Sequence, residues 1–296
     1  MPYGISDLFD VSGLVAVITG GSSGLGKTMA LALATNGAQK VYILGRHKES
    51  LEATAALHPA TITPLIADVG SKASLAGVAS HILTETGYIN LLVANAGILY
   101  LTAPETITNG TGKVQVGRTL KDNPSPMDLE SFLMGTPAEE FLDTFRTNTA
   151  GVFYTIAAFV SLLDAGNRRK NVVQKSQVIA VSSVAAHNRR TTGGCAYGMS
   201  KAAVVHLMRQ MMTLLIPQGI RANTISPGLF PSNLCGSPPE EDITEEGAFA
   251  REFIPLQRAG RCEEIAGAIL YLASRAGGYV NGDLHLIDGG MAGLGG

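Results

Sequence analysis

The sequence contains no tryptophan, and only 16% of its 296 residues are charged. Lys and Arg total 22 against 24 Asp and Glu, and without a basic cluster the chain is not expected to bind nucleic acid. Three cysteines without CxxC spacing cannot form a closed disulfide framework, which indicates a reducing compartment. The six histidines lack the spacing of metal ligands, so no metal site is expected.

The chain also lacks a long apolar run. Val152 to Leu163, the longest nearly apolar stretch, has 12 residues, whereas about 20 are needed to cross a bilayer, so it predicts a core helix. The first residues, MPYGISDLFDVSG, are acidic where a secretory signal would be basic. We therefore expect a cytoplasmic protein with no membrane partner. Because 46% of the residues are apolar, much of the chain must be buried in a core or between subunits.

Short apolar runs rich in β-branched residues alternate with amphipathic segments along the chain. The runs predict strands at Leu14–Ile18, Lys40–Leu44, Thr61–Ala67, Asn90–Ala94, Gln177–Ser182, Ile220–Ile225 and Leu284–Ile287. The amphipathic segments predict helices at Leu25–Asn36, Ser71–Thr86, Pro137–Leu163, Tyr197–Ile216 and Cys262–Ala273. A repeated β-α-β order is typical of a parallel sheet with helices on both faces. The sequence therefore predicts a single doubly wound α/β domain with a parallel seven-stranded sheet.

Two segments break this alternation, and both follow the carboxyl ends of predicted strands, where open α/β sheets bind ligands. Thr102–Gly135 has four Gly, three Pro and no sustained apolar period, which predicts an insertion or long loop. After it, Thr136-Pro137-Ala138-Glu139 predicts a helix start with a capping box. Leu229–Pro255 has six acidic residues against one Arg, and we expect it to be a mobile lid over an apolar substrate. Its expected inner face is Leu229, Phe230, Leu234, Phe249, Phe253 and Ile254.

The loop after the first strand, TGGSSGLGKT, predicts a phosphate site, because glycines let backbone N–H groups approach an anion at a helix N-terminus. Two motifs fit it. Gly21 to Thr28 matches the P-loop pattern GxxxxGK[ST], whereas Gly20, Gly24 and Gly26 match the TGxxxGxG spacing of a dinucleotide-binding loop. The loop alone does not separate a nucleoside triphosphatase from a dinucleotide-binding protein.

Residues downstream of the loop favour a dinucleotide. About 20 positions further on, where such folds present an acid to the ribose hydroxyls, the second strand ends in Gly45-Arg46, and an Arg there suits a 2′-phosphate. The alternative for Arg46 is a solvated surface charge. A P-loop enzyme would need a second Asp, for which Asp68 and Asp288 are candidates, but neither explains the catalytic residues that follow.

A candidate acid, base and hydrogen-bond donor lie around the fifth strand. Tyr197 and Lys201 are one turn apart at the start of a predicted helix, and Ser183 ends the preceding strand beside the competing Ser182. A phenol has a pKa of about 10, and a nearby ammonium lowers it by stabilising the phenolate. Tyr197 could then exchange protons at neutral pH. His187 lies between these groups and is either a substrate-pocket residue or an exposed loop histidine.

Together these motifs resemble the short-chain dehydrogenase/reductase family over nearly the whole length. The similarity includes TGGSSGLG, Asp68-Val69, Asn95-Ala96-Gly97, Asn148 in TNTAGVFY, Ser183 in VSSVAA, YGMSK and NTISPG. Several stretches are similar to fungal NADP-dependent ketoreductases. The resemblance implies a Rossmann fold, NADP as cofactor and a small carbonyl substrate. It also implies a homodimer or homotetramer that buries the long helices beside the fifth strand.

The resemblance also implies the roles of individual residues. Tyr197 would exchange the proton, Ser183 would bind the substrate carbonyl, Lys201 would hold the nicotinamide ribose, and Asn148 would connect Lys201 to solvent through water. The cofactor site would comprise Gly20, Ser22, Ser23, Gly24, Leu25, Gly26, Arg46, Asp68, Val69, Asn95, Ala96, Gly97, Tyr197, Lys201, Pro227, Gly228 and Ser232. Asn148 could instead be a packing residue, and Asn95-Ala96-Gly97 could mainly support the sheet.

The expected reaction is hydride transfer between the nicotinamide and a ketone or secondary alcohol. Ser232 departs from the family, which commonly has a Thr there, but retains the hydroxyl. Three other functions remain open on the sequence. They are a cyclase or isomerase that uses the same residues, a non-catalytic NADP sensor, and a P-loop nucleoside triphosphatase.

Overall fold

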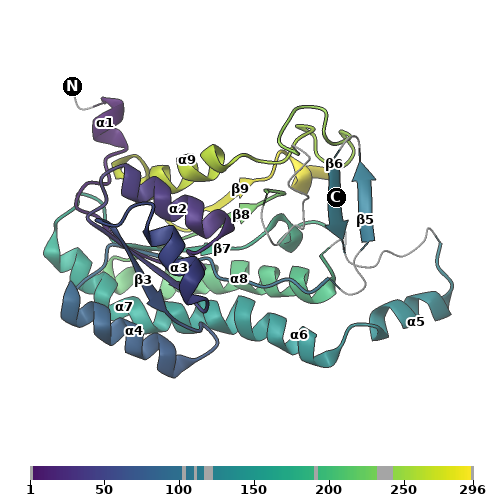
Figure 1. Cartoon of the computed structure of the whole chain (residues 1–296), viewed down its shortest axis with the longest axis horizontal. Helices are drawn as coiled ribbons and strands as arrows, with labels where there is room; N and C mark the ends of the chain where they lie inside the picture. Colours follow the sequence, from purple (N-terminus) through teal and green to yellow (C-terminus); the bar gives the residue numbers. More distant parts are fainter. Residues whose placement is uncertain are drawn as a thin grey trace.

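A computed structural model of the chain contains a central parallel sheet between two layers of helices (Figure 1). It describes residues 3–101, 105–109, 112–116, 123–189, 193–231 and 243–294, with only the backbone for 105–109 and 112–116. The sheet order is β3-β2-β1-β4-β7-β8-β9, with all pairs parallel. The strands are β1 Val15–Thr19, β2 Lys40–Gly45, β3 Ile62–Ile66, β4 Leu91–Ala94, β7 Gln177–Val181, β8 Arg221–Pro227 and β9 Leu284–Ile287. The predicted fold class and all seven predicted strands are confirmed.

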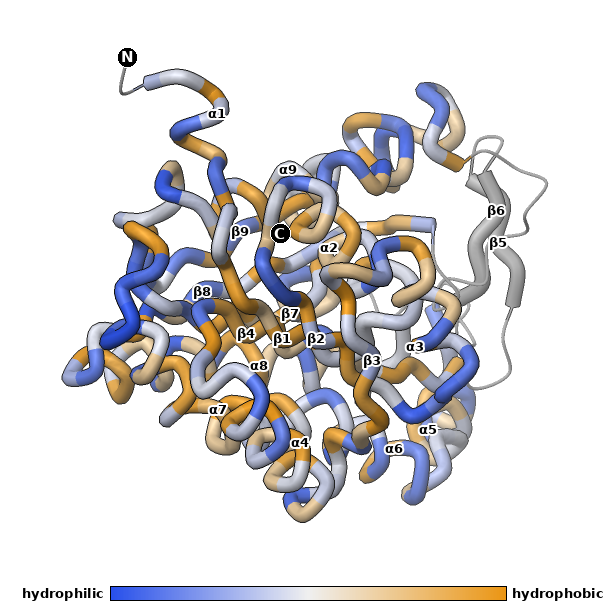
Figure 2. Tube along the Cα trace, turned by 60° about the vertical axis from the view of Figure 1, so that its left-hand side comes forward, coloured by the Kyte–Doolittle hydropathy of each residue, from blue (hydrophilic) through white to orange (hydrophobic). Residues whose placement is uncertain are grey.

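Each face of the sheet packs on its own set of helices. On β1, Val15 and Val17 join one core cluster while Ala16 and Ile18 join the other, because successive side chains of a strand point to opposite faces. Both faces are apolar, and the strands form a largely hydrophobic band inside the molecule (Figure 2). One face is covered by α2 Gly24–Thr35, α3 Lys48–Ala55 and α9 Cys262–Ala273, and the other by α4 Lys72–Glu85, α7 Gly151–Arg169 and α8 Cys195–Leu214.

The remaining short elements lie at the ends of the layers. They are α1 Ile5–Leu8 and the single-turn helices η2 Val184–Ala186, η3 Ile216–Gln218, η4 Arg275–Gly277 and η5 Met291–Leu294. Helix α3 follows β2 and was not among the predicted helices. Its eight residues are too few for an apolar period to be recognised.

Helix α6 (Ala138–Phe145) continues through a π-helical turn, η1 (Arg146–Ala150), into α7. By length and composition alone, Ala138–Arg169 is apolar enough to cross a membrane. In the fold it is a core helix, as predicted, because Phe159 and Leu163 are fully buried against the sheet. The π turn is the one feature of this helix that the apolar pattern did not indicate.

Of the two alternatives predicted for Thr102–Gly135, the long loop was wrong, and the described part has the secondary structure of an insertion. Strands β5 (Glu105–Asn109) and β6 (Gly112–Val116) pair as an antiparallel hairpin, and α5 (Pro126–Met134) follows. Five-residue strands and a nine-residue helix are too short to give a visible period within a segment rich in Gly and Pro. In Figure 1, α5 extends beyond α6, away from the sheet.

The predicted capping box at Thr136–Glu139 was also wrong. Helix α6 has Pro137 as its N-cap, with no side-chain cap, because the backbone of Pro137 is extended (ψ 133°) and Thr136 lies one residue too far out. A capping box occurs instead at α5, where the Ser125 hydroxyl accepts from the backbone N–H of Asp128 at 3.2 Å. The Asp128 carboxylate accepts from the backbone N–H of Ser125 in return at 3.0 Å.

The segment expected to be a lid is described at 229–231 and 243–255. In the described part it forms no helix or strand, as expected of its composition. Phe249, Phe253 and Ile254 are buried in a separate small cluster with Ile243 and Ala259. These apolar side chains therefore pack on one another. Leu234, which was also predicted for the inner face, lies outside the described residues. The lid movement itself stays a prediction.

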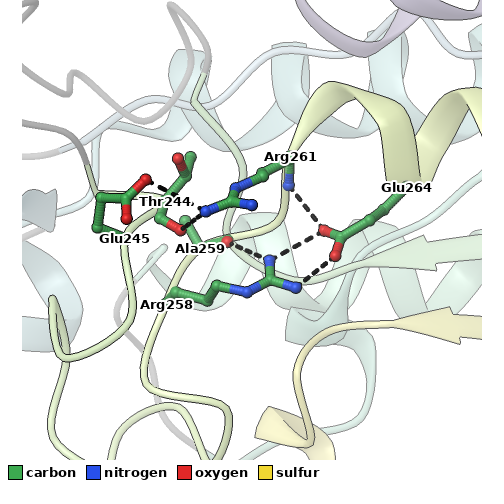
Figure 3. Close-up of polar contacts among 6 residues, drawn as sticks. All are labelled: Thr244, Glu245, Arg258, Ala259, Arg261 and Glu264. Atoms are coloured by element: carbon green, nitrogen blue, oxygen red, sulfur yellow. Dashed lines mark hydrogen bonds and ion pairs between the residues drawn. The ribbon is translucent and has the colours of Figure 1, made fainter.

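Ion pairs join this segment to the start of α9 (Figure 3). The Arg258 guanidinium donates to both carboxylate oxygens of Glu264 and to the carbonyl of Ala259, and it holds the pKa of Glu264 below its usual value. Glu264 also accepts from the backbone N–H of Arg261 at 2.7 Å, which caps the helix. The Arg261 side chain contacts Glu245 at 3.2 Å, so Glu245 within the segment and Arg258 just after it are both tied to the start of α9.

Candidate active site

The loop between β1 and α2 has the geometry of an anion cradle. Gly20 and Gly24 have φ of +66° and +48°, which favour glycine. A Cβ at Gly26 would lie 2.2 Å from the carbonyl oxygen of Gly20, so only glycine allows the helix to approach the loop. The N-cap Ser23 makes no side-chain cap, and the first N–H groups of this 12-residue helix point out of its N-terminus.

The same loop fits a dinucleotide better than a nucleoside triphosphate with Mg²⁺. In a P-loop the Thr28 hydroxyl would bind the metal ion, but here it donates to the carbonyl of Gly24 within the helix at 3.2 Å. The loop also follows the strand from which the sheet order reverses, between β2 and β4, where doubly wound folds bind dinucleotides. The geometry therefore favours the second of the two motifs.

Arg46 and Asp68 follow adjacent strands, because Gly45 of β2 pairs with Ile66 of β3. Arg46 is exposed at the strand end, where a ligand could reach it. The carboxylate of Asp68 accepts from the backbone N–H of Gly70 at 2.9 Å, which fixes the turn. Val69 is largely buried, and its side chain would lie 3.0 Å from a Cβ at Gly151. The two strand ends bring these predicted cofactor residues together.

The residues after β4 divide between support of the sheet and the site. The Asn95 amide donates to the carbonyl of Thr19 at 2.9 Å, and the Thr19 hydroxyl accepts from the backbone N–H groups of Asn95 and Ala96. Asn95 therefore ties β4 to the glycine loop. A Cβ at Gly97 would lie 3.2 Å from Asn148 Oδ1 and 3.3 Å from Lys201 Nζ, so Gly97 leaves room for those side chains.

Lys201 is buried beside Tyr197. Its side chain is 4% exposed, Nζ donates to the carbonyl of Val181 at 3.0 Å, and Nζ lies 5.7 Å from the centroid of the Tyr197 ring. Burial lowers the pKa of Lys201 to about 8, because the ammonium is separated from water. The tyrosine and the lysine predicted as a pair thus share one face of α8.

Asn148 lies inside the π turn and is fully buried. Its side chain accepts from the backbone N–H of Ile98 at 2.8 Å and donates to the carbonyl of Ile98 at 2.9 Å. It also donates to the Ser200 hydroxyl, which in turn donates to the carbonyl of Tyr197. The side chain thus joins the loop after β4 to α8. A π turn removes a backbone carbonyl from the regular helical ladder, and such turns are frequent at functional sites.

The two serines that end β7 have different surroundings. The Ser182 hydroxyl is buried and donates to the carbonyl of Lys201 at 2.8 Å, so it serves the packing of α8. The Ser183 oxygen accepts from the backbone N–H of Ala185 at 3.1 Å, which leaves its own proton for another acceptor. This difference favours Ser183 as the functional serine.

His187 is not the exposed loop histidine of the second alternative, and its role in a substrate pocket stays a prediction. It is partly buried, and its Nε2 lies 3.3 Å from the Ser226 hydroxyl, next to the end of β8. Burial lowers its pKa.

The predicted cofactor residue Gly228 directly follows β8. Its backbone N–H donates to the carbonyl of Ile287. A Cβ on Gly228 would lie 2.7 Å from Asp288 Cα, so this position needs glycine. Ser232 lies outside the described residues.

A cavity of about 470 Å³ opens beside Tyr197. Its walls come from Tyr100, from α5 and α6, and from residues 193–197 before and within α8. Sequence analysis missed this wall, because α5 lies in the segment without a period. It also missed the contact of Tyr100, whose hydroxyl donates to Asp143 at 2.7 Å, although the Asp143–Arg146 pair has helical spacing. The hydrogen bond from Tyr100, and after it the one from Arg146, hold the pKa of Asp143 below its usual value.

Comparisons with known proteins find relatives over nearly the whole chain. The short chain dehydrogenase family model matches residues 14–241. The chain is 43% identical over 290 residues to the short-chain dehydrogenase/reductase PhomF of Diaporthe leptostromiformis, covering 96% of this chain and 93% of that protein. It is 38% identical to VdtF of Byssochlamys spectabilis, covering 96% and 94%.

Among solved structures, the RhlG/NADP active-site complex of Pseudomonas aeruginosa superimposes with a TM-score of 0.76 at 28% identity. The match covers 96% of this chain and 98% of RhlG. Fold, motifs and full-length similarity thus agree. The chain belongs to the short-chain dehydrogenase/reductase family.

Proposed function

We propose that this enzyme is an NADPH-dependent ketoreductase, with Tyr197 as the general acid. The observation that carries the proposal is the arrangement of Tyr197 beside the buried Lys201 and next to an apolar cavity. The glycine cradle fits the pyrophosphate of the cofactor, and exposed Arg46 fits a 2′-phosphate. The similar structure of RhlG was solved with NADP, which supports the same choice of cofactor.

When bound, NADPH supplies a hydride to the carbonyl carbon of the substrate. The Tyr197 phenol donates its proton to the carbonyl oxygen, and the product is a secondary alcohol. The Ser183 hydroxyl donates a hydrogen bond to the same oxygen, since the contact with Ala185 uses a lone pair of its oxygen and leaves its proton available. The Lys201 ammonium stabilises the phenolate that Tyr197 becomes. It would also hold the nicotinamide ribose.

We further propose that Asn148 returns protons to the site. Its side chain is saturated by Ile98 and Ser200, so this role would use a backbone carbonyl of the π turn and a bound water. Asp68 and Val69 would frame the adenine, with Asn95, Ala96 and Gly97 lining the cleft. The cytoplasmic location expected from the sequence stays a prediction.

Replacing Tyr197 by Phe removes the proton donor and keeps the ring. We expect Tyr197→Phe to lose about 10² to 10⁴ in kcat while NADPH binding is retained. Stopped-flow turnover and cofactor fluorescence measure the two effects separately. Tyr279→Phe, at a fully exposed tyrosine, is the matched control and should behave as wild type. Unchanged turnover of Tyr197→Phe would remove Tyr197 from the mechanism.

The cofactor preference depends on Arg46. A charge-assisted hydrogen bond to the 2′-phosphate contributes about 1.5 to 3 kcal/mol, so we expect NADPH to be preferred over NADH by roughly tenfold to hundredfold. Arg46→Asp should erase or reverse this ratio of kcat/KM values. Arg275→Asp, a charge change at an exposed residue after α9, should leave the ratio unchanged. Equal use of both cofactors by the wild type contradicts the assignment.

The pH dependence follows from the burial of Lys201. Because burial lowers the pKa of Lys201 to about 8, the ammonium is present below that pH and is lost above it. We expect kcat/KM for NADPH, which reports the free enzyme, to fall as pH rises through this value. Lys201→Arg keeps its charge and should move the fall to higher pH, whereas Lys48→Arg on exposed α3 should not. A profile that is flat across this range contradicts the role of Lys201.

We also propose a homodimer or homotetramer. Phe153 on α7 and Met199 on α8 are 44% and 52% exposed, and a subunit interface would bury these apolar side chains. Light scattering of the wild type should give an oligomer, and Phe153→Glu should shift it to smaller species. Leu57→Glu, a similar change after α3 on the other face of the sheet, serves as control. A monomeric wild type would overturn the proposal.

A further inference from the structure

The cavity beside Tyr197 is lined largely by apolar side chains, in contrast to the polar residues around Lys201. Phe132, Leu133, Phe141 and Leu142 supply its walls from α5 and α6. Its volume of about 470 Å³ is typical of sites that enclose a small organic ligand, which span about 300 to 1,000 Å³. Tyr197 lies in the wall, so a ligand here would reach the proposed proton donor. The cavity is therefore suited to the body of the substrate.

Two of the polar side chains that line the cavity already have hydrogen-bond partners in the protein. The Tyr100 hydroxyl donates to Asp143, and the Thr144 hydroxyl donates to the carbonyl of Glu140 at 2.7 Å. The residues that line the cavity in the described part of the chain include no Lys or Arg. A phosphate or another anion would lose hydrogen bonds to water here and would meet no basic side chain in the described wall.

Most of the charged residues close to the cavity are acidic, and the basic Arg146 is paired with Asp143. Residues 123–145 contain five Asp and Glu and no Lys or Arg, and one of these acids, Glu140, lines the cavity. This surface would repel a substrate attached to an anionic carrier, such as a coenzyme A thioester or an acidic carrier domain. It has no such effect on a neutral molecule.

We propose that the cavity takes a neutral, apolar ketone of two rings, which enters free, and that α5 is the element that selects it. The inference rests on the proposed function and specifies its substrate class. Helix α5 comes from the insertion after β4 and contains no buried residue. Its apolar residues therefore contribute little to the core, and substitutions in it do not threaten folding.

Two pairs of substrates test the class with NADPH and the full-length enzyme. We expect the bicyclic ketone 2-tetralone to have a kcat/KM at least about tenfold above that of cyclohexanone, because the second ring fills the cavity. Ethyl 3-oxobutanoate should be preferred to 3-oxobutanoyl-coenzyme A, which has the same reacting group, and salt should reduce the difference. Equal values within the ring pair, or preference for the thioester, would overturn the proposal.

Variants of α5 test the wall. Phe132→Ala should reduce the ratio of 2-tetralone to cyclohexanone by about tenfold, since it removes the apolar surface that the second ring contacts. Met127→Ala is the matched control, because Met127 is 80% exposed on the same helix and does not line the cavity. An unchanged ratio for Phe132→Ala would exclude α5 as the selecting element.

A second measurement does not depend on turnover. Cys195 lines the cavity, whereas Cys262 is exposed on α9. With NADP⁺ present, 2-tetralone should slow alkylation of Cys195 by N-ethylmaleimide severalfold and leave Cys262 unchanged, as read by mass spectrometry of peptides. Equal alkylation of Cys195 with and without the ketone would overturn the cavity assignment. Protection of Cys195 in an enzyme that reduces no ketone would instead defeat the proposed function.

Discussion

The burial of the Lys201 ammonium is the constraint on which the rest of the site depends. A charged group that is only 4% exposed requires partners, and the carbonyl of Val181 supplies one at the end of β7. Gly97 must lack a side chain so that the Lys201 Nζ fits. The Ser182 hydroxyl in turn binds the backbone carbonyl of Lys201 on α8. Strand β7, the loop after β4 and helix α8 are therefore placed relative to one another by a single lysine.

The π turn at Asn148 solves a related problem. The helix formed by α6 and α7 packs on the sheet over most of its length, but at Asn148 it must also reach the loop after β4. One extra residue in the turn aims the amide at Ile98 and Ser200, so the loop after β4 and α8 are joined without an unpaired polar atom on that side chain. The local widening of the helix thus serves the site, while its regular part serves the core.

The two segments that follow β4 and β8 differ in how they are held. Residues 243–261 have their own apolar cluster and two ion-pair contacts, through Arg258 with Glu264 and Arg261 with Glu245. Helix α5 has a capping box but no buried residue. Residues 243–261 are thus anchored to α9, whereas α5 can vary in sequence at little cost in stability. A substrate wall is therefore expected to diverge more readily at α5 than at 243–261.

The sequence by itself determined the sheet, the glycine cradle and the pairing of Tyr197 with Lys201. Apolar periods, turn glycines and helical spacing are local signals, and each depends on residues close in the chain. Only the tertiary structure decided which of Ser182 and Ser183 keeps its proton available. It also decided that the Asn148 amide is hydrogen-bonded to Ile98 and that α5 forms a wall of the cavity beside Tyr197. Those contacts join segments far apart in the sequence, and their energy comes from packing that no local pattern records.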